Sequence, residues 1–316
     1  MAPNLLITGA TGFIGSRVAA AAASAREPAG VRLLVRRPPT GPGEPARPRT
    51  ETVLGDLRDP ASLRRACAGI DVVVHCASMI GGDPEEARAV NDAGTRALVE
   101  AATAAGVTRV VSLSTASVHG RGPFRAAAPG TLPLAPVSAT SRTRAAGERY
   151  VLDAGGTVLR PHLVYGTGDR LLMPGLVRLL AALPAPLDGG SSLHSLVDVD
   201  TLAGVLLGAA LSAATEPGPY YVQHPEPVPV GELLAAAEDL LTHRTGRARG
   251  PAVDLGTARA LLADVPFAQH HLDMLAVDHW FADDRPWRDF GRDPGPGFAA
   301  GLAGHLPWYR GLLAGS

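Results

Sequence analysis

The chain has 316 residues, of which 46% are hydrophobic, and its formal net charge is -1. A chain of this length can bury a large core, and its balanced charge excludes the broad basic surface that nucleic-acid or membrane-surface binding requires. The two cysteines are too few for a disulfide framework, and the longest nearly apolar stretch, residues 202–214, is too short to span a bilayer.

These numbers predict a soluble globular protein with no nucleic-acid partner and no membrane partner. We expect Cys67 and Cys76 to be buried thiols. Residues 1–4 lead directly into the first predicted strand, so we also expect no cleavable leader and a cytoplasmic location.

The first fifteen residues predict an anion site. Residues 4–8 are an apolar run of strand length, followed by a turn with glycines at positions 9, 12 and 15 and then by an alanine-rich helix. Glycine lets a diphosphate approach the backbone, and the free N–H groups and the dipole of the helix start hold its charge. The predicted dinucleotide-binding turn comprises Gly9, Thr11, Gly12, Phe13, Ile14 and Gly15.

The second predicted strand, residues 31–35, ends in Arg36 and Arg37. A site for NAD places a carboxylate here for the ribose hydroxyls, whereas a guanidinium pairs with a 2′-phosphate. The sequence therefore favours NADPH/NADP+ as the cofactor, with Arg36 better placed than Arg37 because it is nearer the strand end. Residues 38–48 are rich in proline and glycine, so we expect a loop there in place of a crossover helix.

Strands and helices then alternate. We predict strands at 52–57, 71–78, 109–113 and 157–161 and helices at 61–68, 84–105 and 139–153. This order is typical of a Rossmann-type α/β fold with a doubly wound parallel sheet, whose ligands bind at the carboxyl ends of the strands. Asp56 is placed to meet the adenine, and the predicted crevice gathers residues 9–15, 76–79, 114–119 and 161–162.

After Gly166 the sequence predicts shorter helices and isolated strand-like pieces, such as residues 220–223. We therefore expect residues 1–166 to form the cofactor domain, its sheet completed by segments near 194–223. Residues 167–316 then form mainly a smaller substrate-binding lobe over the crevice.

Several motifs together carry a family resemblance. They are Thr8-Gly9-x-x-Gly12-x-x-Gly15, Gly55-Asp56-Leu57, His75-Cys76-Ala77-Ser78, Asn91-x-x-Gly94-Thr95, Ser114-Thr115-x-x-Val118-x-Gly120, Leu159-Arg160-Pro161-x-x-x-Tyr165-Gly166 and the segments 194–200, 281–284 and 308–310. With these motifs the chain resembles the extended short-chain dehydrogenases/reductases over nearly its whole length. The resemblance implies a Rossmann-type domain, a small C-terminal substrate lobe and a nicotinamide cofactor. The implied cofactor contacts beyond the first turn are Arg36, Arg37, Asp56, Leu57, Cys76, Ala77, Ser78, Arg144, Pro161 and His162.

The chain departs from that family at its catalytic residues. The family has a Ser or Thr on the fifth strand and then Tyr-x-x-x-Lys on the next helix, with a Glu four residues after the Lys. Here the Ser/Thr is Thr115, but Thr140 stands at the Tyr position and Arg144 at the Lys position, with Glu148 after it. A register on Ser138 and Arg142 loses the Glu match, and neither register contains a tyrosine. All 29 basic residues are arginines, which accounts for Arg144 but not for Thr140.

A threonine hydroxyl is too weak an acid to replace the missing phenol near neutral pH. Histidine suits the task, and His119, His162 and His194 are the candidate proton donors, although each also fits a packed or solvent-facing role. We expect no metal site, because His270-His271 and the spacing of His194 to Asp198 lack further ligands.

The substrate itself offers another proton source. A phenol beside the reacting ketone protonates the alkoxide made by hydride delivery, and this arrangement occurs in aromatic polyketides. Without the Tyr, the chain resembles the ketoreductases of angucyclinone antibiotic pathways. We therefore predict a ketoreductase for a polycyclic aromatic ketone; an NDP-sugar 4-ketoreductase or epimerase and a non-catalytic NADP(H) sensor are the alternatives, and the oligomeric state stays open. The candidate substrate contacts are Met79, Ser114, Thr115, Phe124, Thr140, Leu163 and Met173, with Thr115, Thr140, Arg144 and His119 as the candidate catalytic residues.

Overall fold

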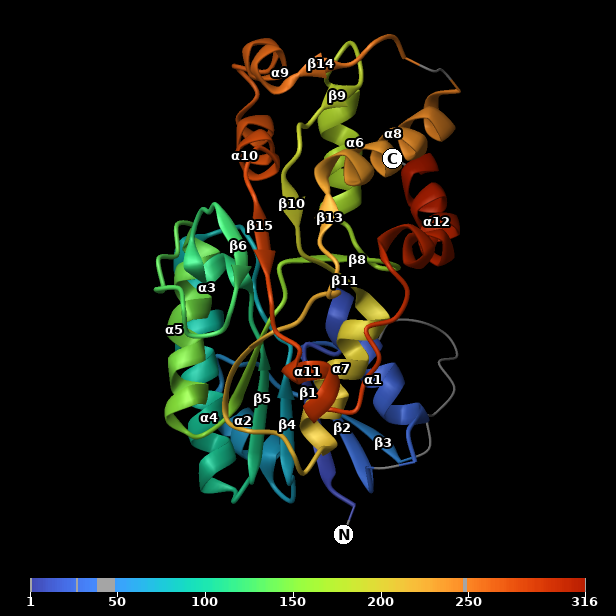
Figure 1. Cartoon of the computed structure of the whole chain (residues 1–316). Helices are drawn as coiled ribbons and strands as arrows, with labels where there is room; N and C mark the ends of the chain where they lie inside the picture. Colours follow the sequence, from blue (N-terminus) through green and yellow to red (C-terminus); the bar gives the residue numbers. More distant parts are fainter. Residues whose placement is uncertain (1, 27, 39–48, 247–248, 316) are drawn as a thin grey trace.

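The computed structural model describes residues 2–26, 28–38, 49–246 and 249–315. Its centre is a seven-stranded parallel sheet with the strand order β12-β7-β5-β4-β1-β2-β3 (Figure 1). The strands are β1 (Asn4–Thr8), β2 (Gly30–Val35), β3 (Thr50–Leu54), β4 (Val72–His75), β5 (Arg109–Leu113), β7 (Thr157–Arg160) and β12 (Gly218–Tyr221). The sheet confirms the Rossmann-type α/β fold.

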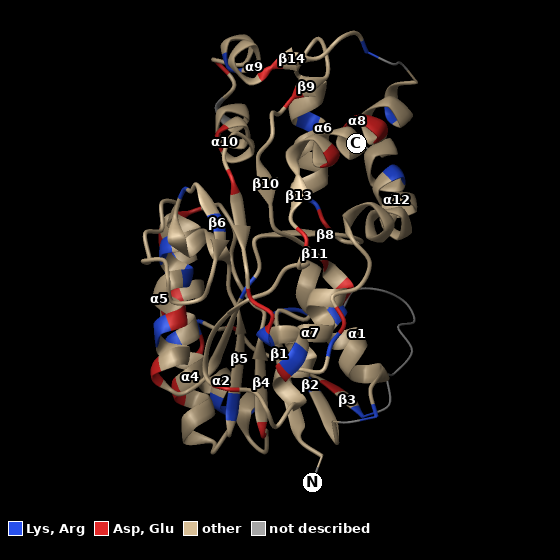
Figure 2. Ribbon diagram, viewed as in Figure 1, with Lys and Arg blue, Asp and Glu red and all other residues tan. Residues whose placement is uncertain are grey.

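Helices cover both faces of this sheet, which explains why β4 and β7 are buried along their whole length and β1 is buried after its first residue. On one face α1 (Phe13–Ser24) packs against α7 (Val199–Leu211). On the other lie α2 (Pro60–Cys67), α4 (Gly94–Ala104) and α5 (Ala139–Asp153). Two separate apolar clusters fill the two faces, and the acidic and basic positions are interspersed along the outer helices (Figure 2).

Strand order reverses at β1, which lies between β2 and β4. Beyond such a reversal the loops at the carboxyl ends of neighbouring strands diverge and leave a crevice for a ligand. Both neighbouring strands pair with β1 in regular parallel register. Asn4 of β1 lies opposite Gly30 of β2, and Thr8 of β1 lies opposite His75 of β4. The glycine-rich turn therefore opens into this crevice.

Two predicted strands end earlier than expected, and one predicted helix is interrupted by a π-helical turn. The third strand ends at Leu54 rather than at Leu57, since residues 55–57 already lead toward the start of α2. The fourth strand ends at His75, before the loop that continues to Met79. The predicted helix 84–105 consists of α3 (Pro84–Arg88), a π-helical turn (Ala89–Ala93) and α4. Most of the predicted loop 38–48 lies outside the described residues.

A second lobe stands above the carboxyl ends of the sheet (Figure 1). Its helices are α6 (Leu172–Ala181), α8 (Val230–Thr245), α9 (Leu255–Leu261), α10 (Pro266–Leu275) and α12 (Phe298–Ala314). The short helix α11 (Arg285–Asp289) instead packs against α7 and β12 of the first lobe. The short strands of the second lobe are β6 (Phe124–Ala127), β8 (Leu163–Tyr165), β9 (Leu187–Asp188), β10 (Leu193–His194), β11 (Leu196–Asp198), β13 (Val228–Pro229), β14 (Val253–Asp254) and β15 (His279–Phe281). The expectation of only shorter helices was wrong, because α8 has 16 residues and α12 has 17.

The two lobes exchange segments. The strand β12 returns from the second half of the chain to pair with β7, and α7 returns with it to cover the sheet. In the other direction β6 leaves the first half to pair with β15 in a four-stranded sheet of the order β13-β10-β15-β6. Within the described residues, no helix has the length and hydropathy to span a membrane.

Candidate nucleotide and ketone site

The turn between β1 and α1 has the backbone of a diphosphate cradle. Gly9 has φ +71°, and a Cβ there would lie 2.6 Å from the backbone nitrogen of Ala77. A Cβ on Gly15 would lie 2.2 Å from the Gly9 carbonyl oxygen, so α1 approaches the turn closely only because this residue is glycine. No side chain caps α1, whose Ncap is Gly12. The first N–H groups of the helix are therefore free for an anion.

The turn separates two cavities that share Thr11 and Gly12. The cavity on the β2 side has a volume of about 330 Å³. Its lining residues from the predicted cofactor set are Gly9, Thr11, Gly12, Arg36, Asp56, Leu57, Cys76, Ala77 and Ser78, and Met79 lines it too. Arg36 lines this cavity and Arg37 does not. The carboxylate of Asp56 accepts from the guanidinium of Arg58, which holds the pKa of Asp56 below its ordinary value.

A chain of buried polar groups begins at Thr8, which lines this first cavity. His75 Nδ1 lies 2.7 Å from the Thr8 hydroxyl, and His75 Nε2 lies 3.0 Å from the Thr95 hydroxyl. Because the Thr95 hydroxyl donates to the Asn91 carbonyl, it accepts the Nε2 proton of His75. Burial, together with the nearby charge of Arg144, lowers the pKa of His75 to about 4, so the ring is neutral at pH 7.

Asn91 holds the loop after β4. Its side-chain oxygen accepts from the backbone N–H of Met79, and its amide nitrogen donates to the Met79 carbonyl and to Thr143 on α5. The Ser78 hydroxyl donates to the same oxygen. The motif around Asn91 was recognised in the sequence, but this clamping role was not, because it depends on contacts with two other segments.

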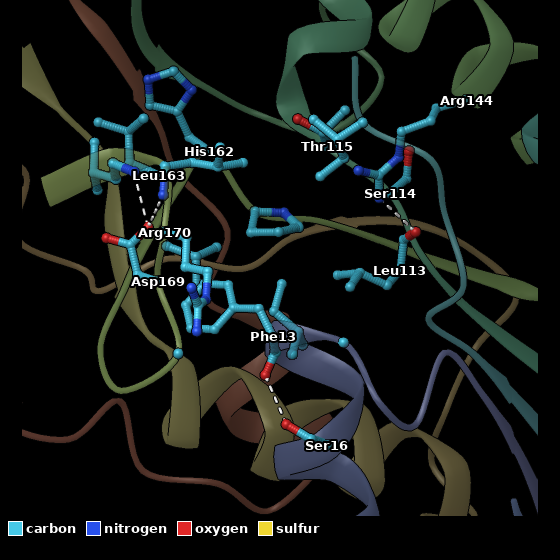
Figure 3. A pocket seen from close by; sticks show the side chains of 18 of the residues that line it. Phe13, Ser16, Leu113, Ser114, Thr115, Arg144, His162, Leu163, Asp169 and Arg170 are labelled. Atoms are coloured by element: carbon cyan, nitrogen blue, oxygen red, sulfur yellow. Dashed lines mark hydrogen bonds between the residues drawn. The ribbon is translucent and has the colours of Figure 1, made fainter. Parts of the chain in front are cut away.

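The second cavity of the turn is larger, about 720 Å³, and Figure 3 shows its interior. Ser114, Thr115 and Arg144 lie on one side of it, and His162 and Leu163 lie opposite (Figure 3). The predicted cofactor residues that line it are Thr11, Gly12, Phe13, Ile14, Arg144, Pro161 and His162. Of all the predicted cofactor contacts, only Gly15 and Arg37 line neither cavity.

Thr115 and Arg144 are each held by one backbone group. The Thr115 hydroxyl oxygen accepts from the N–H of Ser117 at 3.2 Å, so its proton is free to be donated to a ligand oxygen. Arg144 Nη2 donates to the Leu113 carbonyl at 2.8 Å, and its other N–H groups remain for ribose hydroxyls. Burial lowers the pKa of Arg144 to about 10, which leaves the side chain charged at neutral pH.

None of the five tyrosines lines this cavity, and all five are among the described residues. Four of their hydroxyls are bonded elsewhere: Tyr150 to Asp92, Tyr220 to the Glu216 carbonyl, Tyr221 to His119, and Tyr309 to Asp169. Tyr165 is buried beside Phe298 and His305. No phenol therefore reaches the position beside Thr115 from another segment.

Two of the candidate catalytic residues lie away from both cavities. The Thr140 hydroxyl accepts from the N–H of Gly81 at 3.1 Å. His119 is buried, and its Nδ1 donates to the Pro133 carbonyl at 2.8 Å. Its Nε2 then accepts from Tyr221 and from Arg160, which is ion-paired with buried Glu148. Burial lowers the pKa of His119, so this ring accepts protons poorly and carries none to donate at Nε2.

A further cavity of about 380 Å³ continues from the 720 Å³ cavity, and the two share His162, Leu163, His270 and Met274. Phe124 lines this further cavity with Phe281, Val137 and Ala116. Of the predicted substrate contacts, Ser114, Thr115 and Leu163 line the larger cavity, whereas Met173 is fully buried in the core of the upper lobe. The sequence analysis missed the lining residues from the lobe that belong to no motif: Arg170, Leu171, Leu172, His270, His271, Asp273, Met274 and His279.

Comparison with known proteins identifies the family. The model of the NAD dependent epimerase/dehydratase family matches residues 5–222. A 2-alkyl-3-oxoalkanoate reductase of Stenotrophomonas maltophilia is 29% identical over 285 residues, which are 79% of this chain and 84% of that protein. A 4-hydroxy-2-methyl-3-oxo-4-farnesyl-3,4-dihydroquinoline-1-oxide ketoreductase of Stigmatella aurantiaca is 30% identical over 241 residues, 72% of this chain and 70% of that protein.

A solved structure agrees with this result. DesIV, a dTDP-glucose 4,6-dehydratase from Streptomyces venezuelae with NAD and TYD bound, is 25% identical and superposes with a TM-score of 0.74 over 98% of this chain and 97% of that chain. The glycine cradle, the free start of α1 and the cavities on its two sides fit a nicotinamide dinucleotide. The chain belongs to the NAD dependent epimerase/dehydratase family and is an oxidoreductase.

Proposed function

We propose that this oxidoreductase is an NADPH-dependent ketoreductase that reduces a carbonyl of a polycyclic aromatic ketone. The observation that carries the proposal is the composition of the larger cavity. Hydroxyl and guanidinium groups are present at Thr115, Ser114 and Arg144, yet no tyrosine is near them. The cavity can therefore orient a ketone and its cofactor but offers no phenol as a proton donor.

The missing acid has a definite cost. A positioned general acid contributes roughly a hundred- to ten-thousand-fold in rate, about 3 to 5 kcal/mol of barrier. A reduced nicotinamide held by the glycine turn and Arg144 would supply the hydride for the carbonyl carbon. The electron pair of the C=O π bond moves to oxygen, and a phenol beside the carbonyl transfers its proton to that oxygen and becomes a phenolate. The phenolate then recovers a proton from water, so the reaction balances without a protein acid.

The residues of this chain then act by positioning. The Thr115 hydroxyl has a free proton and would orient the ketone oxygen by donating a hydrogen bond to it. Arg144, which is fixed by its hydrogen bond to the Leu113 carbonyl, would hold the ribose of the cofactor. Correct orientation of two reactants can supply about 7 to 11 kcal/mol of a barrier. This contribution exceeds what the lost acid would have provided.

The surroundings favour a lipophilic ketone. Phe124, Val137 and Phe281 are among the apolar side chains that line the further cavity, and the neighbouring strands β8, β10 and β15 carry no Asp, Glu, Lys or Arg (Figure 2). The two named relatives are reductases of an alkyl oxoalkanoate and of a farnesylated quinoline oxide. A nucleotide-sugar diphosphate would need cations around its phosphates, and Arg121 is the one arginine of the further cavity among the described residues, while Arg144 and Arg170 line the larger cavity.

Arg36 supports NADPH as the form of the cofactor. Its exposed side chain follows β2 and lines the cavity that also contains Asp56. A guanidinium at this position can pair with the 2′-phosphate of NADPH. The solved structure of DesIV, by contrast, contains NAD.

The decisive experiment compares two substrates. One is a polycyclic ketone with a phenol beside the carbonyl, and the other is its methyl ether, which keeps the shape but has no proton to give. We expect NADPH oxidation with the phenol and a loss of at least a hundredfold with the ether.

Two histidines provide the protein-acid control, because His270 and His271 both line the larger cavity. If the two substrates react at equal rates and His270→Gln or His271→Gln abolishes that activity, the proton donor is a histidine of the protein and not the phenol of the substrate. Turnover of a nucleotide sugar in preference to either ketone would overturn the proposed substrate class. Cofactor binding without turnover of any ketone would identify a sensor instead of an enzyme.

A further inference from the structure

Three histidines from distant parts of the sequence meet beside the two connected cavities. His162 follows β7, His194 is in β10 and His279 is in β15. One nitrogen of each ring lies within 4.8 Å of a nitrogen of the other two. The ring planes are within 15° of parallel, with centroids 5.3 to 6.1 Å apart. His194 is completely buried and His279 nearly so.

The tautomer of His194 follows from its neighbours. The Ser192 hydroxyl donates its proton to the Leu275 carbonyl at 2.5 Å, so it can only accept from His194 Nε2, which lies 3.2 Å away. The proton of His194 is therefore on Nε2, and Nδ1 carries a lone pair. That Nδ1 is buried and has no hydrogen-bond partner among the described residues.

His279 is fixed in a similar way. Its Nδ1 donates to the Val277 carbonyl at 3.1 Å, which leaves the lone pair on Nε2. This lone pair accepts from the N–H of Gly122 at 3.0 Å. His162 contributes the third nitrogen, because its Nε2 is also buried without a partner among the described residues.

Two unpaired ring nitrogens in one buried cluster are unfavourable in a protein without a ligand there. An unsatisfied buried polar atom costs about 1 to 3 kcal/mol. Histidines that bind metals characteristically donate their outer N–H to a carbonyl or a hydroxyl, as His194 and His279 do here.

We propose that His162, His194 and His279 bind one divalent cation of the zinc class. Three imidazoles without a thiolate suit Zn²⁺ or Co²⁺ rather than Mg²⁺ or Ca²⁺, which prefer oxygen ligands. Zinc–nitrogen bonds of about 2.0–2.1 Å place tetrahedral ligand nitrogens about 3.4 Å apart. The ring nitrogens must therefore approach by up to about 1.4 Å, the rings must tilt out of their parallel arrangement, and His279 must exchange the Gly122 N–H for the ion.

The surroundings tolerate this charge and explain where the ion acts. Asp278 adjoins His279 in the chain and provides a carboxylate there, which is also ion-paired with Arg125. His162 lines both connected cavities, and His279 lines the smaller one. A bound ion thus joins the end of β7 to two strands of the upper lobe across the wall of the ketone site.

A second histidine–carboxylate group does not compete as a candidate. Asp198, Asp200 and His305 also approach one another. The Asp198 carboxylate, however, is bonded to His305 Nε2 and to the first N–H groups of α7, and Asp200 is ion-paired with Arg17. Asp198, Asp200 and His305 each already have a hydrogen-bond or ion-pair partner, so this group has no unpaired buried atom that would favour binding of an ion.

The test uses the full-length chain without a histidine tag. The protein is stripped with a chelator, equilibrated with Co²⁺ or Zn²⁺, and freed of excess ion by gel filtration. We expect one ion per chain by elemental analysis, visible ligand-field absorption with Co²⁺, and a rise of several degrees in the unfolding temperature. His162→Asn, whose ring is partly exposed, should lose the bound ion and the temperature rise, and His194→Ala should do the same.

Matched controls are Asp200→Asn, in the other cluster, and His243→Asn, an exposed histidine on α8. Both should retain one ion per chain. Sub-stoichiometric metal in the wild type, or full retention by His162→Asn, would overturn the proposal. If His194→Ala does not fold, the result with His162→Asn decides alone. None of these readouts depends on ketone reduction, so the outcome is separate from that of the proposed function.

Discussion

The Thr140 hydroxyl accepts a hydrogen bond of 3.1 Å from the backbone N–H of Gly81, and it is therefore engaged with the loop after β4. Thr140 stands at the sequence position of the family's tyrosine, but it lines neither the larger cavity nor its continuation. Thr115 lines the larger cavity and has a free hydroxyl proton. The two threonines therefore differ in their access to a ketone oxygen.

Valine substitutions test this difference, since they remove only the hydroxyl. We expect Thr115→Val to lower kcat by roughly a hundredfold, the effect of losing one hydrogen-bond donor to a developing oxyanion. Thr140→Val should lower kcat by less than about threefold and mainly increase hydrogen exchange in residues 79–82, a far smaller loss than that of a general acid. Comparable losses of kcat in the two variants would show that Thr140 reaches the substrate.

The cofactor preference is tested by charge reversal next to β2. Arg36 lines the cavity on the β2 side, and the adjacent Arg37 is equally exposed but does not line it. Arg36→Asp should raise the Kd for NADPH by roughly ten- to hundredfold, the value of a charge-assisted hydrogen bond, and change the Kd for NADH much less. Arg37→Asp controls for the change in overall charge and should alter both by less than about threefold. Equal weakening of NADPH and NADH by Arg36→Asp would remove this residue from the phosphate site.

How far the sequence could predict the site depends on where each residue lies in the chain. The glycine turn and α5 were predicted with the correct bounds, because a glycine pattern and the spacing from Thr140 to Glu148 are local signals. The third strand ends before its predicted end because the motif Gly55-Asp56-Leu57 follows the strand and is not part of the strand.

Contacts between distant segments gave no such signal. Nothing near His162 in the sequence indicates that His194 and His279 will lie beside it, and their convergence depends on the parallel pairing of β10 with β15. The same is true of His270 and Met274, which reach the cavities only because α10 stands above them. Tertiary packing decides these neighbours, and local periodicity does not encode it.

The buried ion pair of Glu148 and Arg160 should be costly to break. The Glu148 carboxylate accepts hydrogen bonds from Arg160 Nε at 3.1 Å and from Arg160 Nη2 at 2.6 Å. Both side chains are less than a tenth exposed. Glu148→Gln leaves a buried positive charge without its partner and should lower the free energy of unfolding by about 3–5 kcal/mol. Glu85→Gln breaks the exposed pair with Arg88 and should change it by less than about 1 kcal/mol. Urea unfolding of both variants measures the difference, and similar small values would show that the buried pair contributes no more than the exposed one.

Stability should fall below about pH 6.5 because of His75. Burial lowers its folded-state pKa from 6.5 to about 4, so the unfolded chain binds a proton that the folded chain excludes over that range. The stabilising contribution is therefore complete above pH 6.5 and is lost as the pH falls toward 4. It amounts to about 3 kcal/mol, because the ring is almost fully buried.

Urea unfolding at pH 7 and at pH 4.5 checks this contribution. The difference in the free energy of unfolding between the two pH values should be smaller in His75→Asn than in the wild type by about 2 to 3 kcal/mol. His243→Asn, which alters an exposed histidine, should retain the full wild-type difference. An unchanged difference in His75→Asn would assign the acid sensitivity to other groups.

Gly9 and Gly69 form a matched pair for testing the diphosphate cradle. Their φ angles are +71° and +72°, so an alanine side chain is strained to a similar extent at both, by about 1 to 2 kcal/mol. They differ in their surroundings: a Cβ at Gly9 would lie 2.6 Å from the backbone of Ala77, while a Cβ at Gly69 would meet nothing within 4 Å. Because the obstacle at Gly9 is backbone, the turn or the loop after β4 must move.

Gly9→Ala should therefore raise the Kd for NADP+ by more than tenfold and cost more stability than Gly69→Ala, which should bind the cofactor like the wild type. Isothermal titration with NADP+ measures the first effect, and urea unfolding measures the second. A similar modest loss of stability in both variants with normal NADP+ binding would mean that the turn tolerates a methyl group, so its close approach to Ala77 would not be what shapes the diphosphate site.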